Sequence, residues 1–318
     1  MQSTPEIVAE TRSLTKTYGK VVAVDNLSLS IPKGGVFGLL GPNGSGKTTT
    51  MSMLLGLTKP TAGTMRLFGK DTSDGHDEAL RRIGAIVETP SFYPYLSGRG
   101  NLRYFQGIGR KGSPGEVDKL LEMVDLKARA NSKFATYSLG MKQRLGIAYA
   151  LLGNPDLVFL DEPTNGLDPA GMAEVRSLVK SLGTGGRTVL LSSHLLNEVE
   201  MVCDSVAILS KGKLIAQGDV QDLLRRQGAV RLHSTDDARA SAILSALPWV
   251  AGIRAEGGLI EVTAPVERAW ELTQALAAQR IYVSEMAQVR VSLEEYFLEV
   301  TGEPAAEAAA IAVGGTSR

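Results

Sequence analysis

The sequence is poor in several features that define whole classes of proteins. Cys203 is the only cysteine in 318 residues, which excludes an internal disulfide and is typical of a reducing compartment. No apolar run approaches the roughly 18 residues that cross a bilayer, and the N-terminal segment has no charged-then-apolar secretion signal. We therefore expect a cytoplasmic protein, and any membrane-spanning part of its assembly would belong to another chain.

The sequence also lacks an excess of charge of one sign. Lysine and arginine together number 34, as do aspartate and glutamate, so the formal net charge is zero. A protein that coats nucleic acid needs an excess of positive charge, so no nucleic-acid partner is expected. The chain is 43% hydrophobic, and its length is enough for about two domains.

The order of apolar runs predicts an α/β core with a parallel sheet. Residues 36–40, 157–160 and 188–191 are continuous apolar runs, which are typical of buried parallel strands, and helical segments alternate with them. Shorter strands in residues 7–31 predict a small antiparallel sheet, with the first strand at its edge. Residues 77–126 are expected to be mostly helical.

A glycine-rich loop leads from the first apolar strand into a helix. The context of strand, loop and helix makes a G-x-x-x-x-G-K-[ST] match a phosphate site, because backbone N–H groups and the helix N-terminus face the anion. Lys47 is expected to reach the β- and γ-phosphates, and Thr48 to ligate Mg²⁺. A glycine turn with a solvated lysine is the alternative. The residues expected at the nucleotide are Gly41, Pro42, Asn43, Gly44, Ser45, Gly46, Lys47, Thr48 and Thr49.

Two adjacent carboxylates follow the apolar run 157–160. Ligands collect at the carboxyl ends of strands in open α/β sheets. We expect Asp161 to hold the metal and Glu162 to act as general base on the attacking water. Two solvated acids at a strand end are the alternative, which the phosphate loop upstream disfavours.

One histidine follows the third apolar run. A lone histidine at a strand end is more often structural than catalytic, but beside the phosphate loop and the acidic pair His194 is a candidate to contact the γ-phosphate and orient the water. His76 and His233 are assigned no role. No histidine or cysteine cluster has zinc spacing.

Between Ile7 and about Gly218 the chain carries an ordered series of motifs. In chain order they are Tyr18, the phosphate loop, Glu88, residues 137–144, Asp161 with Glu162, residues 165–168 and His194. Each motif alone could arise by chance, whereas the ordered set is specific. The series resembles that of the nucleotide-binding subunit of an ABC transporter.

The resemblance implies a head-to-tail homodimer with two ATP molecules between the subunits. In such a dimer Tyr18 would stack on adenine, although a turn tyrosine that packs on the sheet is the alternative. Ser138 and Gly140 would reach the γ-phosphate bound by the other subunit. Asp168 would lie at the dimer contact and link the two sites.

The sequence departs from the family pattern at two places. The usual signature L-S-G-G-Q has Leu139 in place of a glycine and Met141 in place of the glutamine, so we expect altered dimer packing. The switch-loop position, usually glutamine, is Glu88, which the resemblance makes a catalytic residue and a ligand of Mg²⁺ or water. The alternative is that Glu88 only caps the loop around Pro90.

The resemblance also implies a membrane partner. The loop with Phe92, Tyr93 and Tyr95 would form part of a groove for a separate permease, with the subunit peripheral on the inner face of the membrane; an aromatic mini-core is the alternative. The signature and the segment 293–298 are similar to those of bacitracin- and daunorubicin-type resistance ATPases. This similarity implies export of a drug, antibiotic or peptide.

The predicted fold is a phosphate-loop nucleoside triphosphatase core with antiparallel β and helical subdomains, followed by a small α+β module. A β-α-β-β-α-β order in the second part suggests a ferredoxin-like fold, with Ser292 as N-cap of a closing helix. The expected boundaries are 1–219 for the ATPase domain (helical subdomain about 88–150), 220–228 for a linker helix, 229–301 for an accessory or regulatory domain and 302–318 for a disordered tail.

Two other functions compete with transport. A soluble ABC-type ATPase acting on DNA or ribosomes is one, but the chain has neither sustained heptads nor a second phosphate loop. The other is a nucleotide sensor whose C-terminal module binds a small ligand. The substrate and the permease cannot be named from this chain.

Overall fold

The computed structural model forms two compact units, which divide between Gln217 and Gly218. Each unit is described by itself. The residues described are 6–88, 90–109, 112–225, 228–289 and 292–301. The predicted disordered tail, 302–318, therefore lies outside the described residues.

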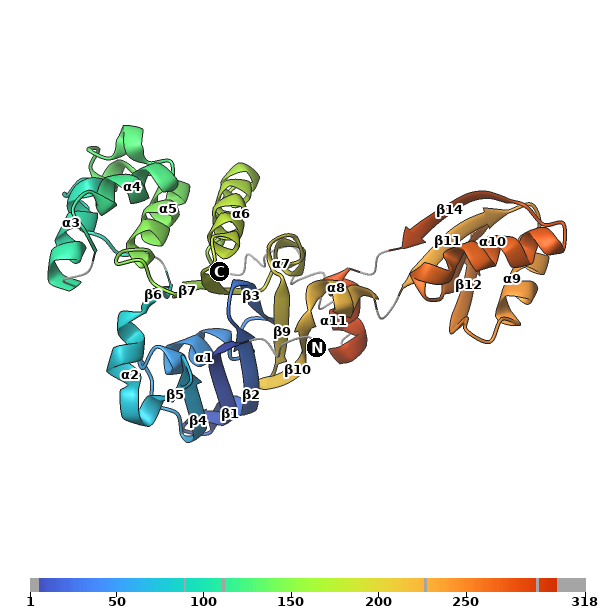
Figure 1. Cartoon of the computed structure of the whole chain (residues 1–318), viewed down its shortest axis with the longest axis horizontal. Helices are drawn as coiled ribbons and strands as arrows, with labels where there is room; N and C mark the ends of the chain where they lie inside the picture. The colour runs from blue at the N-terminus through green and yellow to red at the C-terminus, as the bar shows by residue number, and fades with distance from the viewer. Residues whose placement is uncertain (1–5, 89, 110–111, 226–227, 290–291, 302–318) are drawn as a thin grey trace. The chain divides into compact units, whose positions relative to one another are not determined.

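The first unit begins with an antiparallel sheet of four strands in the order β2-β1-β4-β5 (Figure 1). The first strand pairs on both sides, with β2 and with β4, so its predicted edge position is wrong. The sequence analysis expected strands in the part of the chain that forms β2 but did not predict β4, which pairs with the other side of β1. The strands are β1 (Ile7–Tyr18), β2 (Val21–Pro32), β4 (Ala62–Leu67) and β5 (Lys70–Asp71).

The second sheet of this unit has six strands in the order β10-β9-β3-β8-β7-β6. The pairs that join β9, β3, β8, β7 and β6 are parallel. Leu40 pairs with Ser193 and Asp161 with Ser192, so three strands end at the same edge. The strands are β3 (Gly35–Leu40), β6 (Ile83–Ile86), β7 (Leu157–Asp161), β8 (Thr188–Ser193), β9 (Ser205–Ser210) and β10 (Lys213–Asp219).

Strand β6 lies inside the segment 77–126 that was expected to be mostly helical. Its four residues pair with β7. A Cβ on Gly84 would lie 1.7 Å from the carbonyl oxygen of Ala150, so a glycine is needed where the end of a helix meets this strand.

Seven helices lie among the described residues of the first unit. Figure 1 shows α3, α4 and α5 gathered in one helical group, and all three fall within the residues 88–150 where a helical subdomain is expected. The helices are α1 (Lys47–Leu54), α2 (Thr72–Arg81), α3 (Gly98–Gly109), α4 (Glu116–Met123), α5 (Leu139–Ala150), α6 (Pro169–Thr184) and α7 (Leu196–Val202), with 3₁₀ turns at Lys127–Arg129 and Phe134–Thr136.

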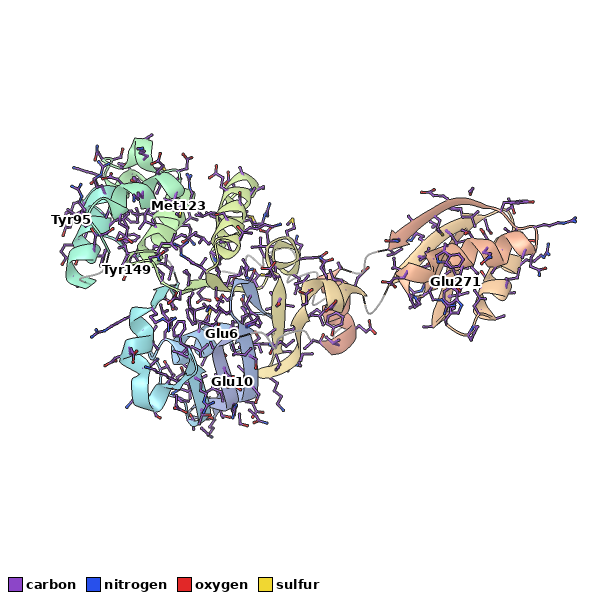
Figure 2. All side chains as sticks on the ribbon, in the orientation of Figure 1. Glu6, Glu10, Tyr95, Met123, Tyr149 and Glu271 are labelled. Atoms are coloured by element: carbon purple, nitrogen blue, oxygen red, sulfur yellow. The ribbon has the colours of Figure 1, made fainter. Side chains whose placement is uncertain are left out.

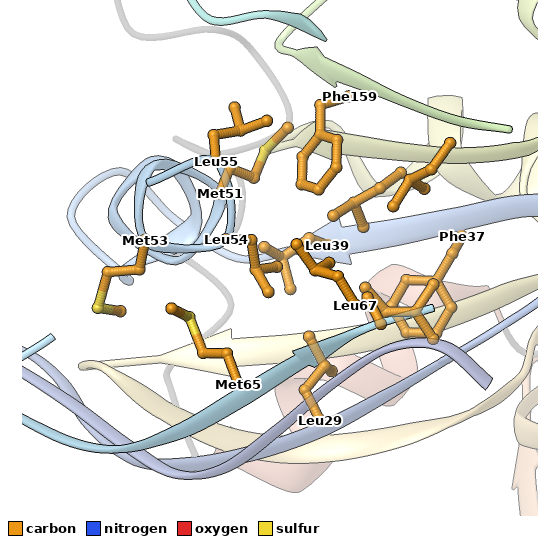
Figure 3. Close-up of a cluster of buried hydrophobic side chains, with 14 of the residues drawn as sticks. Leu29, Phe37, Leu39, Met51, Met53, Leu54, Leu55, Met65, Leu67 and Phe159 are labelled. Carbon is orange, nitrogen blue, oxygen red and sulfur yellow. The ribbon is translucent and has the colours of Figure 1, made fainter. Parts of the chain in front are cut away.

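Helix α1 is held in the core between the two sheets. Its residues Met51 and Leu54 are fully buried, as are Leu39 and Phe159 of the parallel sheet and Leu67 of the antiparallel sheet (Figure 3). Burying one such side chain contributes about 1.5–3 kcal/mol. This packing fixes the start of α1, and with it the end of the glycine-rich loop.

The second unit contains a four-stranded antiparallel sheet in the order β12-β13-β11-β14. The succession β-α-β-β-α-β is present, and α9 and α10 contribute Leu244 and Leu272 to an apolar core with Val230 and Val262. The elements are α8 (Val220–Arg225), β11 (Ala229–Ser234), α9 (Asp237–Ser245), β12 (Gly252–Glu256), β13 (Leu259–Thr263), η3 (Val266–Arg268), α10 (Ala269–Ala278), β14 (Val283–Val289) and α11 (Leu293–Thr301).

The closing helix α11 starts with a reciprocal cap. The Glu295 N–H donates to Ser292 Oγ at 3.2 Å, and the Ser292 N–H donates to Glu295 Oε2 at 3.0 Å. The predicted N-cap is confirmed, because this pair of bonds is a capping box. None of the helices in the described ranges combines the length and apolarity that a membrane crossing requires.

Candidate nucleotide site

The glycine-rich loop follows β3 at the edge where β7 and β8 also end. Gly41 has φ +145°, and a Cβ there would lie 2.1 Å from the carbonyl oxygen of Leu209. Gly46 has φ +103° and directly precedes α1. The loop therefore needs glycine at both positions to curl under the helix N-terminus.

Lys47, the first residue of α1, is 5% exposed and crosses the loop that precedes it. Its Nζ donates to the carbonyl oxygens of Gly41 at 2.7 Å and Pro42 at 3.2 Å, and lies 3.5 Å from Glu162 Oε1. Burial lowers the pKa of Lys47, whereas the carboxylates of Glu162 and Asp161 oppose that shift. The ammonium group is thus held at the mouth of the loop by charge on one side and carbonyls on the other.

Thr48 and Asp161 face each other across the loop and the end of β7. Thr48 Oγ1 donates to Asp161 Oδ2 at 3.0 Å. The buried Ser192 hydroxyl, from β8, donates to Asp161 Oδ1 and accepts the Glu162 N–H at 3.0 Å. The sequence analysis missed Ser192, whose only signal was a hydroxyl at the end of an apolar strand.

Glu162 and His194 form a second pair of contacting side chains at the edge where β7 and β8 end. His194 Nδ1 lies 2.8 Å from Glu162 Oε2, so that the ring donates when the proton is on Nδ1 and leaves Nε2 free. Burial would raise the pKa of Glu162, but the hydrogen bond and charge of His194 and the charge of Lys47 outweigh it, and the net shift is downward. Glu162 also has φ +47°, a strained backbone of the kind that collects at active sites.

The chemistry of these groups fits a magnesium-bound nucleotide. Ser45 Oγ is buried and has no hydrogen-bond partner among the described residues, as expected for a polar atom that faces a ligand. Mg²⁺ is usually bound by one or two protein oxygens together with substrate phosphates, and Thr48 with Asp161 supplies such a pair. No cluster of three or more histidine, cysteine, aspartate or glutamate residues suited to a metal occurs in the described part of the chain.

Two predicted residues, Tyr18 and Glu88, form no hydrogen bond or ion pair with this group within the described residues. Tyr18 ends β1, is 49% exposed, and has Lys16 Nζ 4.8 Å from its ring centroid. Glu88 follows β6 with φ +66° and is exposed. Within the described residues it forms no hydrogen bond or ion pair with Thr48 or Asp161, so the structure does not bring it to the predicted metal ligands.

The signature residues lie at the start of α5, on the helical subdomain. Ser138 is the N-cap of α5 and accepts the Met141 N–H at 3.3 Å. Leu139 Cδ2 lies 3.3 Å from where a Cβ on Gly166 would be. Leu139, which stands where the usual signature has a glycine, therefore packs on the segment before α6. Asp168 is the N-cap of α6.

An apolar cavity of about 400 Å³ opens between the sheet edge at β6 and the helical subdomain. Phe105 and Tyr149 line it together with Leu57, which is 67% exposed (Figure 2 labels Tyr149). Phe92 packs edge-on against Phe105 and Tyr149 at 5.7 and 5.9 Å. The predicted loop aromatics thus form a cluster that supports the cavity wall, although Phe92, Tyr93 and Tyr95 are not among the residues that line the cavity.

A buried lysine in a glycine loop, a threonine–aspartate pair and a glutamate–histidine pair at one edge of a parallel sheet define a phosphate-loop nucleoside triphosphatase. Residues 24–165 match the ABC transporter family. Bacitracin transport ATP-binding protein BcrA of Enterococcus faecalis is 37% identical over 93% of this chain and 97% of its own length. The daunorubicin/doxorubicin resistance ATP-binding protein DrrA of Streptomyces peucetius is 35% identical over 96% of both chains. The chain belongs to the ATP-binding subunits of ABC transporters and is an ATPase of that family.

Solved structures agree with this assignment. A dimeric post-hydrolysis state of an ATP-binding cassette bound to ADP and Pi superposes with a TM-score of 0.60 at 28% identity, covering 67% of this chain and 98% of that chain. An ATP-binding subunit of an ABC transporter gives a TM-score of 0.61 at 32% identity, covering 69% of this chain and 92% of that chain. The predicted family, the α/β phosphate-loop fold and the resemblance to bacitracin- and daunorubicin-type proteins are confirmed.

Proposed function

We propose that this subunit works as a head-to-tail homodimer that hydrolyses ATP and drives export of a drug, antibiotic or peptide through a separate membrane permease. The observation that carries the proposal is the contact chain from Lys47 through Glu162 to His194. It joins a phosphate-binding cation, a carboxylate base and a polar ring at the edge where the glycine loop ends.

The loop and α1 bind the nucleotide. Backbone N–H groups of the loop and the N-terminus of α1 face the phosphates, and Lys47 interacts with the β- and γ-phosphates. Thr48 and Asp161 would hold Mg²⁺, which would neutralise charge on the phosphate oxygens. Ser192 orients Asp161 through its hydrogen bond.

Glu162 and His194 act on the hydrolytic water. Glu162 accepts a proton from the water while the water oxygen forms a bond to the γ-phosphorus and the bond to the ADP oxygen breaks. His194 Nδ1 donates to the Glu162 carboxylate. A contact of Nε2 with the γ-phosphate needs a proton on Nε2 as well, because phosphate oxygens only accept hydrogen bonds. The pKa of Glu162 is shifted downward, so the carboxylate is ionised at neutral pH and has a free lone pair for the water proton.

A second copy completes each site. Ser138 and Gly140 of one copy contact the γ-phosphate held by the other, because a hydroxyl and a bare N–H at the start of a helix bind an anion. Tyr18, half-exposed at the end of β1, stacks on adenine, and Asp168 lies at the contact between copies. Glu88 keeps its proposed role as a carboxylate facing metal or water, supported only by its place after β6, next to β7.

The permease docks on the apolar cavity beside the helical subdomain, and this contact keeps the subunit at the inner face of the membrane. Exposed Leu57 and Tyr149 on its rim support the proposal, because exposed apolar patches mark interaction sites. One relative is a bacitracin transport protein and another is a daunorubicin/doxorubicin resistance protein, which supports a drug or antibiotic as substrate. The second unit is an accessory domain of ferredoxin-like fold, supported by its element order.

Co-purification from detergent-solubilised membranes of the source cells tests the transport assignment. The wild-type chain is expected to bring down an integral-membrane permease, and ATP turnover of the pair in proteoliposomes is expected to rise with the exported drug. Leu57→Glu should lose the permease but keep ATP binding, whereas Met123→Glu, also exposed and on α4 (labelled in Figure 2), should keep both. Recovery of the chain without any membrane protein, or equal loss in both variants, would contradict the assignment.

A further inference from the structure

A partly buried ion pair joins α6 to α7 behind the nucleotide site. Arg176 Nη1 donates to Glu198 Oε1, and the two side chains are 23% and 10% exposed. The other carboxylate oxygen, Glu198 Oε2, is buried and has no hydrogen-bond partner within the described residues. A pair desolvated to this degree stabilises a fold poorly compared with apolar residues of the same size, so its presence calls for another reason.

The pair holds a helix that has little stability of its own. Helix α7 has seven residues, and its N-cap, Leu195, provides no side-chain cap. Helices this short depend on tertiary contacts. Glu198 lies in the first turn of α7, four residues after His194, so the contact with Arg176 fixes the turn that follows the histidine.

The pair also borders the segments that carry the two reacting-site residues. A cavity of about 20 Å³, enough for about one water molecule, is lined by Arg176 and Glu198 together with Thr164 and Ser193. Thr164 comes two residues after Glu162, and Ser193 directly precedes His194. A change in the pair therefore changes the packing directly behind the bond between His194 and Glu162.

Helix α6 is a firm support for this contact. It has 16 residues, is capped by Asp168, and buries Val175 and Val179. Arg144 of α5 lies 3.6 Å from Glu174 on the same helix. Helix α6, which carries Arg176, is thus held in place by its N-cap, by its buried apolar side chains and by the ion pair with α5.

We propose that Arg176 and Glu198 are positioning residues for His194: the pair anchors the first turn of α7 on α6 and so keeps Nδ1 of His194 on the Glu162 carboxylate. The inference rests on the proposed function, in which that carboxylate accepts the proton of the hydrolytic water. The inference predicts that loss of the pair lowers the rate of ATP turnover and changes the surroundings of the His194 ring. The affinity for ATP should change little.

The test compares Arg176→Met/Glu198→Leu with a control that removes an exposed ion pair from the second unit, Arg231→Met/Glu261→Leu. Replacing both partners avoids leaving one buried charge unpaired. In the first variant kcat is expected to fall roughly tenfold or more, with the Kd for ATP within about twofold; the control should match the wild type. In the background of His194→Ala, removing the pair should lower kcat less than about twofold, because its effect acts through the histidine.

A second readout needs no turnover. The chain has three histidines, so the NMR signal of the His194 ring in the free protein should move in the variant while those of His76 and His233 stay. Equal losses of kcat in both backgrounds, an unchanged kcat, or an unmoved His194 signal would overturn the inference. Should the double variant fail to fold, Arg176→Gln/Glu198→Gln, which removes both charges and keeps both side chains polar, takes its place in the same cycle and is judged by the same outcomes. Failure of the proposed function would appear instead in the wild type, as absent ATP turnover with the His194 signal still responding to the pair.

Discussion

The two units of the chain bury different kinds of side chains. Among the described residues, every buried polar or charged side chain lies in the first unit, including Lys47, Asp161 and Glu198. The core of the second unit consists of apolar residues such as Val230 and Leu272, and its ion pair Arg231–Glu261 is exposed. Burying charge is unfavourable unless it is paired. The buried charged groups therefore indicate that the first unit carries out the chemistry, whereas the apolar core of the second unit serves its stability.

The largest effect that this comparison predicts is on turnover. Glu162→Gln keeps the shape of the side chain but cannot accept the water proton, so kcat for ATP should fall by about 10²–10⁴ while ATP still binds. The change is measured by phosphate release under saturating ATP, with Glu261→Gln in the second unit as control. A wild-type rate in Glu162→Gln would remove Glu162 from the chemistry.

The second unit should respond to a core change in stability alone. Leu272 is fully buried, and Leu272→Ala is expected to cost about 2–5 kcal/mol by leaving a cavity. Calorimetry should show loss of stability in the transition of the second unit, with the Kd for ATP unchanged. Trp270→Ala, on the same helix but 61% exposed, should change the transition little. A parallel loss of ATP binding in Leu272→Ala would break the separation of roles.

The first unit should lose nucleotide affinity when its buried cation is removed. Lys47→Ala deletes a charge-assisted contact worth about 1.5–3 kcal/mol, so the Kd for ATP should rise roughly tenfold to a hundredfold. Isothermal titration measures the change, and Lys180→Ala on α6, where the lysine is exposed, is the control. Retained tight binding in Lys47→Ala would contradict the phosphate role of the loop.

The smallest predicted effect is a shift in pH dependence. The pKa of Glu162 lies below its ordinary 4.5 because His194 and Lys47 outweigh burial. Its ionised form therefore contributes stability above pH 4.5, which is lost as the pH falls through the lower folded value. His194→Ala removes the largest opposing contribution, so the pKa should rise and the acid limb of kcat/KM should move to higher pH. An acid limb that stays in place would mean that another group controls it.

The sequence predicted the parts of this site that have fixed spacing. The glycine loop, Asp161 with Glu162, and His194 each follow an apolar strand, and the parallel register brings their ends together. Strand β6 was missed because four residues that include a glycine carry little pattern. The positive φ of Glu162, the bridging hydroxyl of Ser192 and the pair Arg176–Glu198 depend on contacts across the fold, which no local pattern encodes.

Glu88 marks the limit of reasoning from motif position. Its place in the motif order predicted contact with the metal or water, which stays a prediction. Glu88 is exposed and forms no hydrogen bond or ion pair with Thr48 or Asp161 within the described ranges. A loop residue after a short strand is placed by the backbone around it and by what binds there, and neither is visible in the sequence.

The central claim is that two copies of this chain close around ATP. Glu162→Gln, which binds ATP without consuming it, should elute with ATP and Mg²⁺ at twice the 33.8 kDa mass of one chain, and return to that mass with ADP. Light scattering during size-exclusion chromatography measures this directly. A single-chain mass under saturating ATP would contradict the composite site.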